Sequence, residues 1–180
     1  MSHLQRLSAF GGLLMLTGCF VSESPLIPPG QAVLPVDGPI TVCLEEADPC
    51  FEMQVSGDGY ETAPQANGEL GRARFSPLTQ AADRQVYILE AQTEGGGLTY
   101  ILARRAPNSE PRGASFELAG IACSDLPDTV LDRFESDGGI YSGGFVANCA
   151  SPNLDVLKVA LVNGFSTHLD DPNWWLEQGS

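Results

Sequence analysis

Apolar and polar residues alternate with period two along much of the chain between residues 39 and 122. Such alternation is typical of β-strands that bury one face. It is clearest in residues 39–44 and 50–55, and residues 85–93 and 98–105, which are rich in Val, Ile, Tyr and Leu, are the strongest strand predictions. Glycine-rich turns stand between these segments, at residues 57–59 and 94–97. Weaker strands are expected at residues 70–75 and 115–122. This part of the chain is therefore predicted to be antiparallel, β-rich and built from hairpins.

The first two segments each contain a cysteine, and together they predict the register of a hairpin. If Cys43 faces Cys50, the pairs that follow are Val42 with Phe51, Thr41 with Glu52 and Ile40 with Met53. In this register the apolar residues share one face and the cysteines share the other. The four domain cysteines allow three pairings. This register selects Cys43–Cys50 and leaves Cys123–Cys149.

The last third of the domain predicts two successive units of strand, cysteine and helix. Residues 115–122 precede Cys123 and a short helix with Pro127 in its first turn. A glycine-rich strand at residues 139–147 precedes Cys149 and a second helix, which Asn163-Gly164 should end. If the two strands are parallel neighbours, a right-handed crossover brings both cysteines together.

These elements predict one α+β domain over residues 40–180. Its N-terminal part is an antiparallel, hairpin-rich β region, two strand-helix units follow, and two disulfides connect the chain. The domain has 141 residues, enough for a substantial core. No cysteine spacing is C-x-x-C, so neither a thioredoxin-type site nor a zinc knuckle is indicated.

The N-terminus has the pattern of a signal peptide. A short segment with one arginine is followed by ten apolar residues, 7–16, which is too short for a helix that spans a bilayer. Leu16-Thr17-Gly18-Cys19 then resembles the lipobox of bacterial lipoprotein precursors. The resemblance implies removal of residues 1–18, a diacylglycerol on Cys19 and an acyl chain, commonly palmitate, on the freed amine. Two or three such chains hold a protein stably on a membrane.

Residues 19–39 are expected to be the lipidated cysteine and a proline-rich tether. Five prolines stand in this segment, and such chains favour an extended polyproline II conformation. The residue after Cys19 is Phe20. In the sorting rule of enteric bacteria, aspartate at that position retains a lipoprotein in the inner membrane. Its absence favours the outer membrane, with the domain facing the periplasm.

Charge limits the partners of the mature chain. Cleavage removes one of nine basic residues and none of 23 acidic ones, so the net charge becomes 8 − 23 = −15. This balance argues against nucleic acid and anionic lipid, which are bound through clustered lysine and arginine. It is compatible with a cationic envelope protein or with divalent cations, although acidity also serves solubility alone.

The sequence indicates no catalytic site, metal site or cofactor. A Ser-His-Asp triad would have to use His168, and no serine stands in a Gly-x-Ser-x-Gly elbow. The acidic pairs do not have calcium-loop spacing and are explained by solvated loops and helix caps. Trp174-Trp175 would either pack on the core or form a contact with a partner.

Residues 56–60, Ser-Gly-Asp-Gly-Tyr, resemble the Ser-Gly-x-x-Tyr element of bacterial lysozyme-inhibitor lipoproteins. The chain departs from that family where a second motif with Trp and Lys should follow. The first hypothesis is accordingly a non-enzymatic envelope lipoprotein with a binding or structural role. The alternative is an inhibitor or binder of a cationic enzyme or peptide, and an enzyme is the third class.

Overall fold

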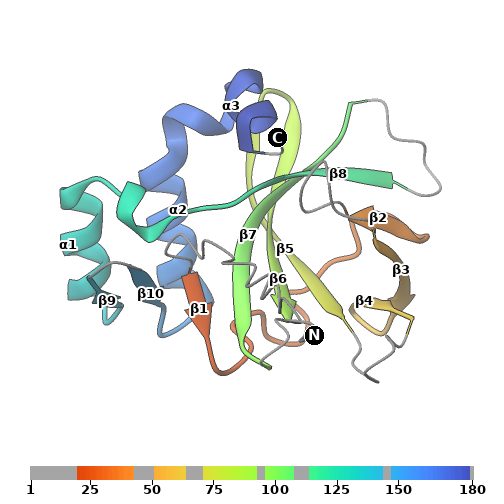
Figure 1. Ribbon diagram of the computed structural model, residues 1–180, viewed down its shortest axis with the longest axis horizontal. Helices are drawn as coiled ribbons and strands as arrows, with labels where there is room; N and C mark the ends of the chain where they lie inside the picture. The colour runs from red at the N-terminus through yellow and green to blue at the C-terminus, as the bar shows by residue number, and fades with distance from the viewer. Residues whose placement is uncertain are drawn as a thin grey trace, which may run out of the picture.

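The computed structural model describes residues 20–42, 51–63, 71–92, 96–107, 114–143 and 147–178. The strands in these residues are β1 (Phe20–Ser22), β2 (Ile40–Val42), β3 (Phe51–Ser56), β4 (Gly59–Thr62), β5 (Arg72–Ala81), β6 (Arg84–Gln92), β7 (Leu98–Arg105), β8 (Ala114–Ala119), β9 (Ile140–Ser142) and β10 (Asn148–Ala150). The helices are η1 (Cys123–Asp125), α1 (Asp128–Ser136), α2 (Leu154–Leu169) and α3 (Pro172–Gln178). The fold is α+β and rich in β-structure, as the sequence predicts (Figure 1).

Strands β2 to β8 close into a barrel. They pair in the ring order β2-β3-β4-β5-β6-β7-β8, and β8 then pairs in parallel with β2. The other pairings of the ring are antiparallel. Each strand of the ring is therefore paired on both sides over at least part of its length. The interior holds one hydrophobic core, which includes Ile40, Met53, Tyr60, Phe75, Leu89 and Phe116.

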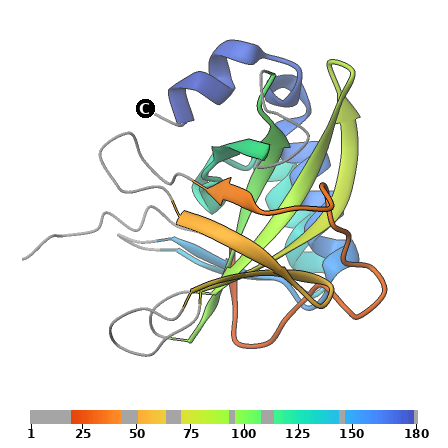
Figure 2. The same ribbon diagram turned by 90° about the vertical axis from the view of Figure 1, so that its right-hand side faces the viewer.

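Strands β6 and β7 are buried on both faces. On β6, Val86 and Ile88 belong to a second core beneath the helices, whereas Leu89 belongs to the barrel interior. Burial on both faces explains why the central residues of these strands, 86–89 and 100–103, are continuously apolar in sequence. The helices gather on one side of the barrel, and Figure 2 shows β2 and β3 on the opposite side.

A second, smaller sheet begins on β7. One edge of β7 pairs with β6 along its length, and the other edge is divided between two strands. Residues 102–105 of β7 pair with β8, and residues 98–100 pair with β1. β1 pairs in parallel with β10, which pairs antiparallel with β9. The first described strand of the chain is thus inserted between β7 and β10 (Figure 1).

Residues 20–39 pack on the barrel, so the prediction of an extended tether is wrong from residue 20 onward. The side chains of Phe20 and Ile27 are 1% and 0% exposed. The carboxylate of Glu90 accepts hydrogen bonds from the amides of Leu26 and Ile27, at 2.8 and 3.2 Å. The prolines do limit the number of amide donors in this segment. The apolar residues between them are nevertheless buried in the core, and Glu90 accepts hydrogen bonds from two of their amides.

The predicted register of the first hairpin is confirmed. Ile40 pairs with Met53, Thr41 with Glu52 and Val42 with Phe51. The cysteines from which the register was derived, Cys43 and Cys50, lie outside the described residues, and their disulfide stays a prediction. The agreement follows from the period-two side-chain alternation, because a shift of one residue would place every apolar side chain on the wrong face.

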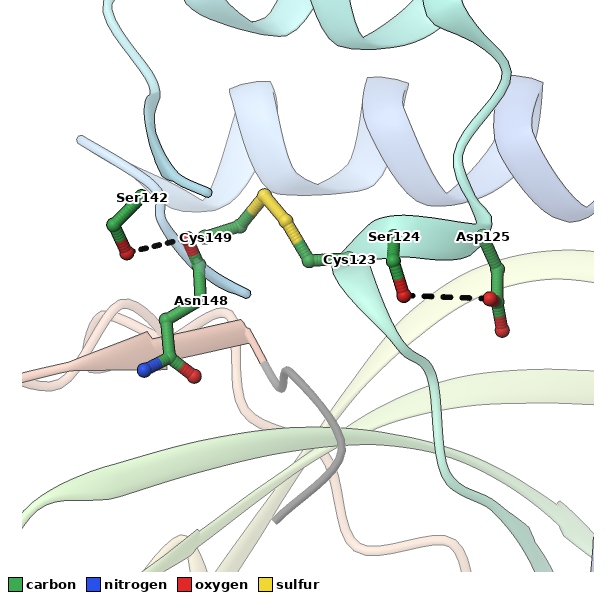
Figure 3. Close-up of a disulfide and its surroundings, with 6 residues drawn as sticks. All are labelled: Cys123, Ser124, Asp125, Ser142, Asn148 and Cys149. Atoms are coloured by element: carbon green, nitrogen blue, oxygen red, sulfur yellow. Dashed lines mark hydrogen bonds between the residues drawn. A yellow bond between two sulfur atoms is a disulfide. The ribbon is translucent and has the colours of Figure 1, made fainter. Parts of the chain in front are cut away.

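The disulfide between Cys123 and Cys149 is confirmed, but the arrangement predicted to produce it is wrong. Cys123 begins η1 and Cys149 lies in the middle of β10, with their Cα atoms 5.8 Å apart (Figure 3). β8 and β10 are not neighbours, because β7 and β1 stand between them. In place of the predicted single strand at residues 139–147, the described residues form the short strand β9, which pairs with β10 beginning at Asn148.

Helix α1 forms close to where it was predicted, but it begins at Asp128, so Pro127 stands at its N-cap and not in its first turn; α2 is longer than predicted. Asn153 caps α2 by accepting a hydrogen bond from the Val156 amide at 3.0 Å. The helix continues through Asn163-Gly164 to Leu169. A Cβ atom on Gly164 would overlap the side chain of Leu126, so this glycine permits close packing instead of ending the helix.

Candidate functional site

The candidate site is β1, where the chain enters the fold directly after Cys19. Cys19 lies outside the described residues, but it is covalently joined to Phe20, the first residue of β1. Phe20 is paired on both sides, with Tyr100 of β7 and Cys149 of β10. Its ring meets the ring of Phe134 from α1 edge to face, with centroids 5.8 Å apart. The residue that follows Cys19 is therefore held by two strands and a helix.

Polar side chains also fasten β1 and the residues that follow it. The Ser22 hydroxyl lies 2.8 Å from the Tyr100 hydroxyl, which donates a hydrogen bond to Glu90 at 3.0 Å. Burial raises the pKa of Tyr100, because its ionised form would lose solvation and stand beside the Glu90 carboxylate. The Arg74 guanidinium, 4.0 Å from Glu90, donates a hydrogen bond to the Ile27 carbonyl at 3.2 Å. This cluster satisfies the amides of residues 26 and 27 below the surface.

The disulfide lies next to β1. Cys149 is the residue of β10 that pairs with Phe20, and its sulfur is bonded to Cys123 at the start of η1. Both cysteines are fully buried. In Figure 3 the Ser142 hydroxyl of β9 donates a hydrogen bond to the Asn148 carbonyl, at 3.1 Å. The disulfide thus connects the sheet that receives β1 to the chain that leads into α1.

A second polar cluster lies under α3. Arg104 of β7 is 1% exposed, its Nε lies 2.5 Å from Glu117 and its guanidinium lies 4.4 Å from the ring centre of Trp175. Burial lowers the pKa of Arg104, and the hydrogen bond to Glu117 opposes that shift. Arg84 reaches the same carboxylate at 3.2 Å. The cluster fastens α3 to the barrel through the contact of Arg104 with Trp175. Its one signal in the sequence is that Arg104 stands two residues after Leu102, on the same face of β7.

The two tryptophans have different environments. Trp175 is 1% exposed and its indole N–H donates a hydrogen bond to the Leu169 carbonyl at 3.1 Å. The prediction of a partner contact is therefore wrong for Trp175, which belongs to the core. Trp174 is half-buried and stacks on the exposed ring of His168, with centroids 5.4 Å apart.

The element that resembles lysozyme inhibitors is the β3–β4 hairpin. Ser56 ends β3 and Gly59 begins β4, with Gly57 at a positive φ in the turn. Tyr60 is 1% exposed, and its hydroxyl donates a hydrogen bond to the Val36 carbonyl at 2.8 Å. The tyrosine of this element is thus a core residue, and the turn before it is the accessible part.

Helix α1 presents two different faces to its surroundings. One face lines a groove of about 290 Å³ against α2, with Val130, Phe134 and Val159 among the lining residues. The opposite face, together with η1, carries exposed acidic residues at helical spacing, namely Asp125, Asp128, Asp132 and Glu135. None of these four acids takes part in the ion pairs of the described residues. We call them the α1 acidic stripe.

No protein-family model, curated protein or solved structure matches this chain. Among the helices of the described residues, none combines the length and apolar composition needed to cross a bilayer. The same part of the chain holds no cluster of three His, Cys, Asp or Glu side chains placed to bind a metal ion.

Replacing Trp175 with alanine tests its role in the core. We expect Trp175→Ala to lower the free energy of unfolding by about 3–5 kcal/mol, because it leaves a large cavity and removes the contact with Arg104. The control is Leu176→Ala, whose side chain is 65% exposed and whose loss should change stability by less than about 0.5 kcal/mol. Urea unfolding followed by circular dichroism measures both. Equal, small effects would contradict the core assignment.

Proposed function

We propose that this chain is the precursor of a lipid-anchored protein of the bacterial cell envelope. In this proposal it is cut before Cys19, and acyl chains on the new N-terminus hold it to a membrane. The observation that carries the proposal is that the lipobox-like residues 16–19 end where β1 begins. Removal of residues 1–18 would therefore leave every described element of the fold intact.

The proposed location is the outer membrane, with the domain facing the periplasm. A phenylalanine after Cys19 in place of the aspartate of the sorting rule supports this choice. The buried Cys123–Cys149 disulfide supports an oxidising compartment, because cytosolic proteins seldom keep such bonds. The proposed role there is non-enzymatic, either binding or structural.

Lipidation can be tested at Cys19. We expect Cys19→Ser to abolish incorporation of radiolabelled palmitate and to release the protein from the membrane fraction, because serine has no thiol to accept the diacylglycerol. Thr17→Ser is the matched control, since it keeps a small residue at its lipobox position and should remain labelled. Unchanged labelling and membrane association of Cys19→Ser would contradict the proposal.

The predicted disulfide between Cys43 and Cys50 tests both the proposed compartment and the first hairpin. The confirmed pairing of Val42 with Phe51 stands one position from Cys43 and Cys50 in each strand. We expect non-reducing peptide mapping of envelope-purified protein to find Cys43 joined to Cys50, separately from Cys123–Cys149. A peptide that joins the two pairs would refute the register, and four free thiols would argue against an oxidising compartment.

The second candidate function is the binding of a cationic protein or peptide by this domain. Its support is the α1 acidic stripe together with the net charge of the mature chain, 8 − 23 = −15. Arg133, which lies in the same helix, is paired with Asp137 at 2.6 Å and does not neutralise the stripe. Unneutralised charge of one sign raises the rate and affinity of association with an oppositely charged partner at low salt.

Neutralising the stripe tests this partner. The probes are a basic lysozyme and a lysine-rich peptide, titrated by calorimetry at 0.01 M and 0.15 M salt. The Debye length falls from about 30 Å to about 8 Å over this range, so binding should weaken strongly as salt increases. We expect the triple variant Asp128→Asn, Asp132→Asn and Glu135→Gln to bind several-fold more weakly than the unchanged chain.

The control makes the same change in net charge elsewhere. Asp37→Asn, Glu52→Gln and Asp83→Asn alter exposed acids of the barrel side. Equal weakening by both triple variants would indicate a general charge effect without a site on α1. Absence of binding to either probe at low salt would remove the second candidate and leave the lipid anchor untouched.

A further inference from the structure

The sheet formed by β1, β10 and β9 has one buried face and one open face. Side chains alternate along each strand, and residues paired across strands point to the same side. The row Phe20, Cys149 and Tyr141 points inward, since Phe20 meets Phe134 and Cys149 is bonded to Cys123. The next row therefore points outward. It consists of Val21, Ala150 and Ile140.

The strands of the outward face carry no charge in a strongly acidic protein, and its row Val21, Ala150 and Ile140 is apolar, with Asn148 and Ser142 beside it. Val21 and Ala150 are half-buried, and Ile140 is 66% exposed, more than Val55 or Val159. The three strands read Phe-Val-Ser, Asn-Cys-Ala and Ile-Tyr-Ser, so none of their residues is charged. A partly exposed surface without charged side chains can be covered by an apolar phase without the cost of desolvating a charge.

The proposed anchor starts directly beside this face. Cys19 precedes Phe20, and consecutive Cα atoms are about 3.8 Å apart. Neighbouring strands are about 4.8 Å apart, so Ile140, two strands away from Val21, lies within roughly 15 Å of Cys19. Because Phe20 is buried and paired on both sides, no flexible residues remain between the lipid and the sheet. The acyl chains cannot enter a bilayer unless this part of the domain comes to the bilayer surface.

We propose that the outward face of β1, β10 and β9 rests against the lipid bilayer in which the acyl chains of Cys19 are inserted. The inference rests on the proposed lipid anchor and adds an orientation to it. The helical layer then lies on the side away from the membrane, since α1 packs on the inward face through Phe134. The α1 acidic stripe is consequently directed away from the lipid headgroups and toward soluble partners.

Fluorescence quenching by brominated lipid tests the orientation. The lipidated full chain is reconstituted into phosphatidylcholine vesicles with or without bromine on the acyl chains. Ile140→Trp and Ser142→Trp place reporters on the outward side of β9, and Val159→Trp places one on α2, in the helical layer. The emission of Trp174 and Trp175 is measured in the unchanged chain and subtracted.

We expect brominated lipid to reduce the added emission of both β9 reporters at least twofold and to leave that of Val159→Trp nearly unchanged. Flotation with the vesicles, measured on each sample, reports the anchor independently of the orientation. Protein that floats while the β9 reporters are quenched no more than Val159→Trp would overturn the orientation and leave the anchor standing. Protein that does not float would overturn the anchor and the orientation together.

Discussion

The divided edge of β7 is the constraint on which the rest of the structure depends. Its second half pairs with β8, and that pairing is one of the links that close the barrel. Its first half pairs with β1 and so extends the sheet toward β10 and β9. If β8 paired along the whole edge, the barrel would still close, but β1 would lose one of its two neighbours. Both the closed core and the fastening of the N-terminal segment thus come from one strand.

Two buried charged groups secure the outer face of β6 and β7. Glu90 accepts hydrogen bonds from the segment that follows β1, and Arg104, which is paired with Glu117 of β8, holds α3 through Trp175. The Glu90 carboxylate and the Arg104 Nε each have specific partners among apolar neighbours, and such pairing lowers the cost of burying charge. The apolar faces provide most of the burial, and these polar contacts determine where the two ends of the described chain attach.

The sequence predicted the features that depend on local side-chain alternation. It did not predict the pairing of segments that are far apart in the chain. The register of Ile40 with Met53 follows from side-chain alternation, and the pattern of Val130 and Phe134 identifies a helix face without knowledge of its neighbours. By contrast, the alternation of a strand does not identify its partner, so neither the insertion of Phe20 beside Cys149 nor closure of the barrel could be derived. Gly164 was misassigned because a glycine that ends a helix and one that permits close packing look the same in sequence. For the candidate site, the lipobox-like residues 16–19 indicated Cys19. Nothing in the sequence indicated that Phe20, the next residue, begins a buried strand.

If the chain is exported as proposed, the insertion of β1 would affect the order of events. Phe20 would be among the first residues of the mature chain to cross the membrane, whereas its parallel partner Cys149 stands 129 residues later. The N-terminal strand would then have to wait, unpaired on that side, until most of the polypeptide has been translocated. Contacts between distant parts of a sequence also slow folding itself. Acylation at Cys19 would meanwhile confine this unfinished chain to the membrane surface, where its apolar strands need protection from aggregation during their maturation.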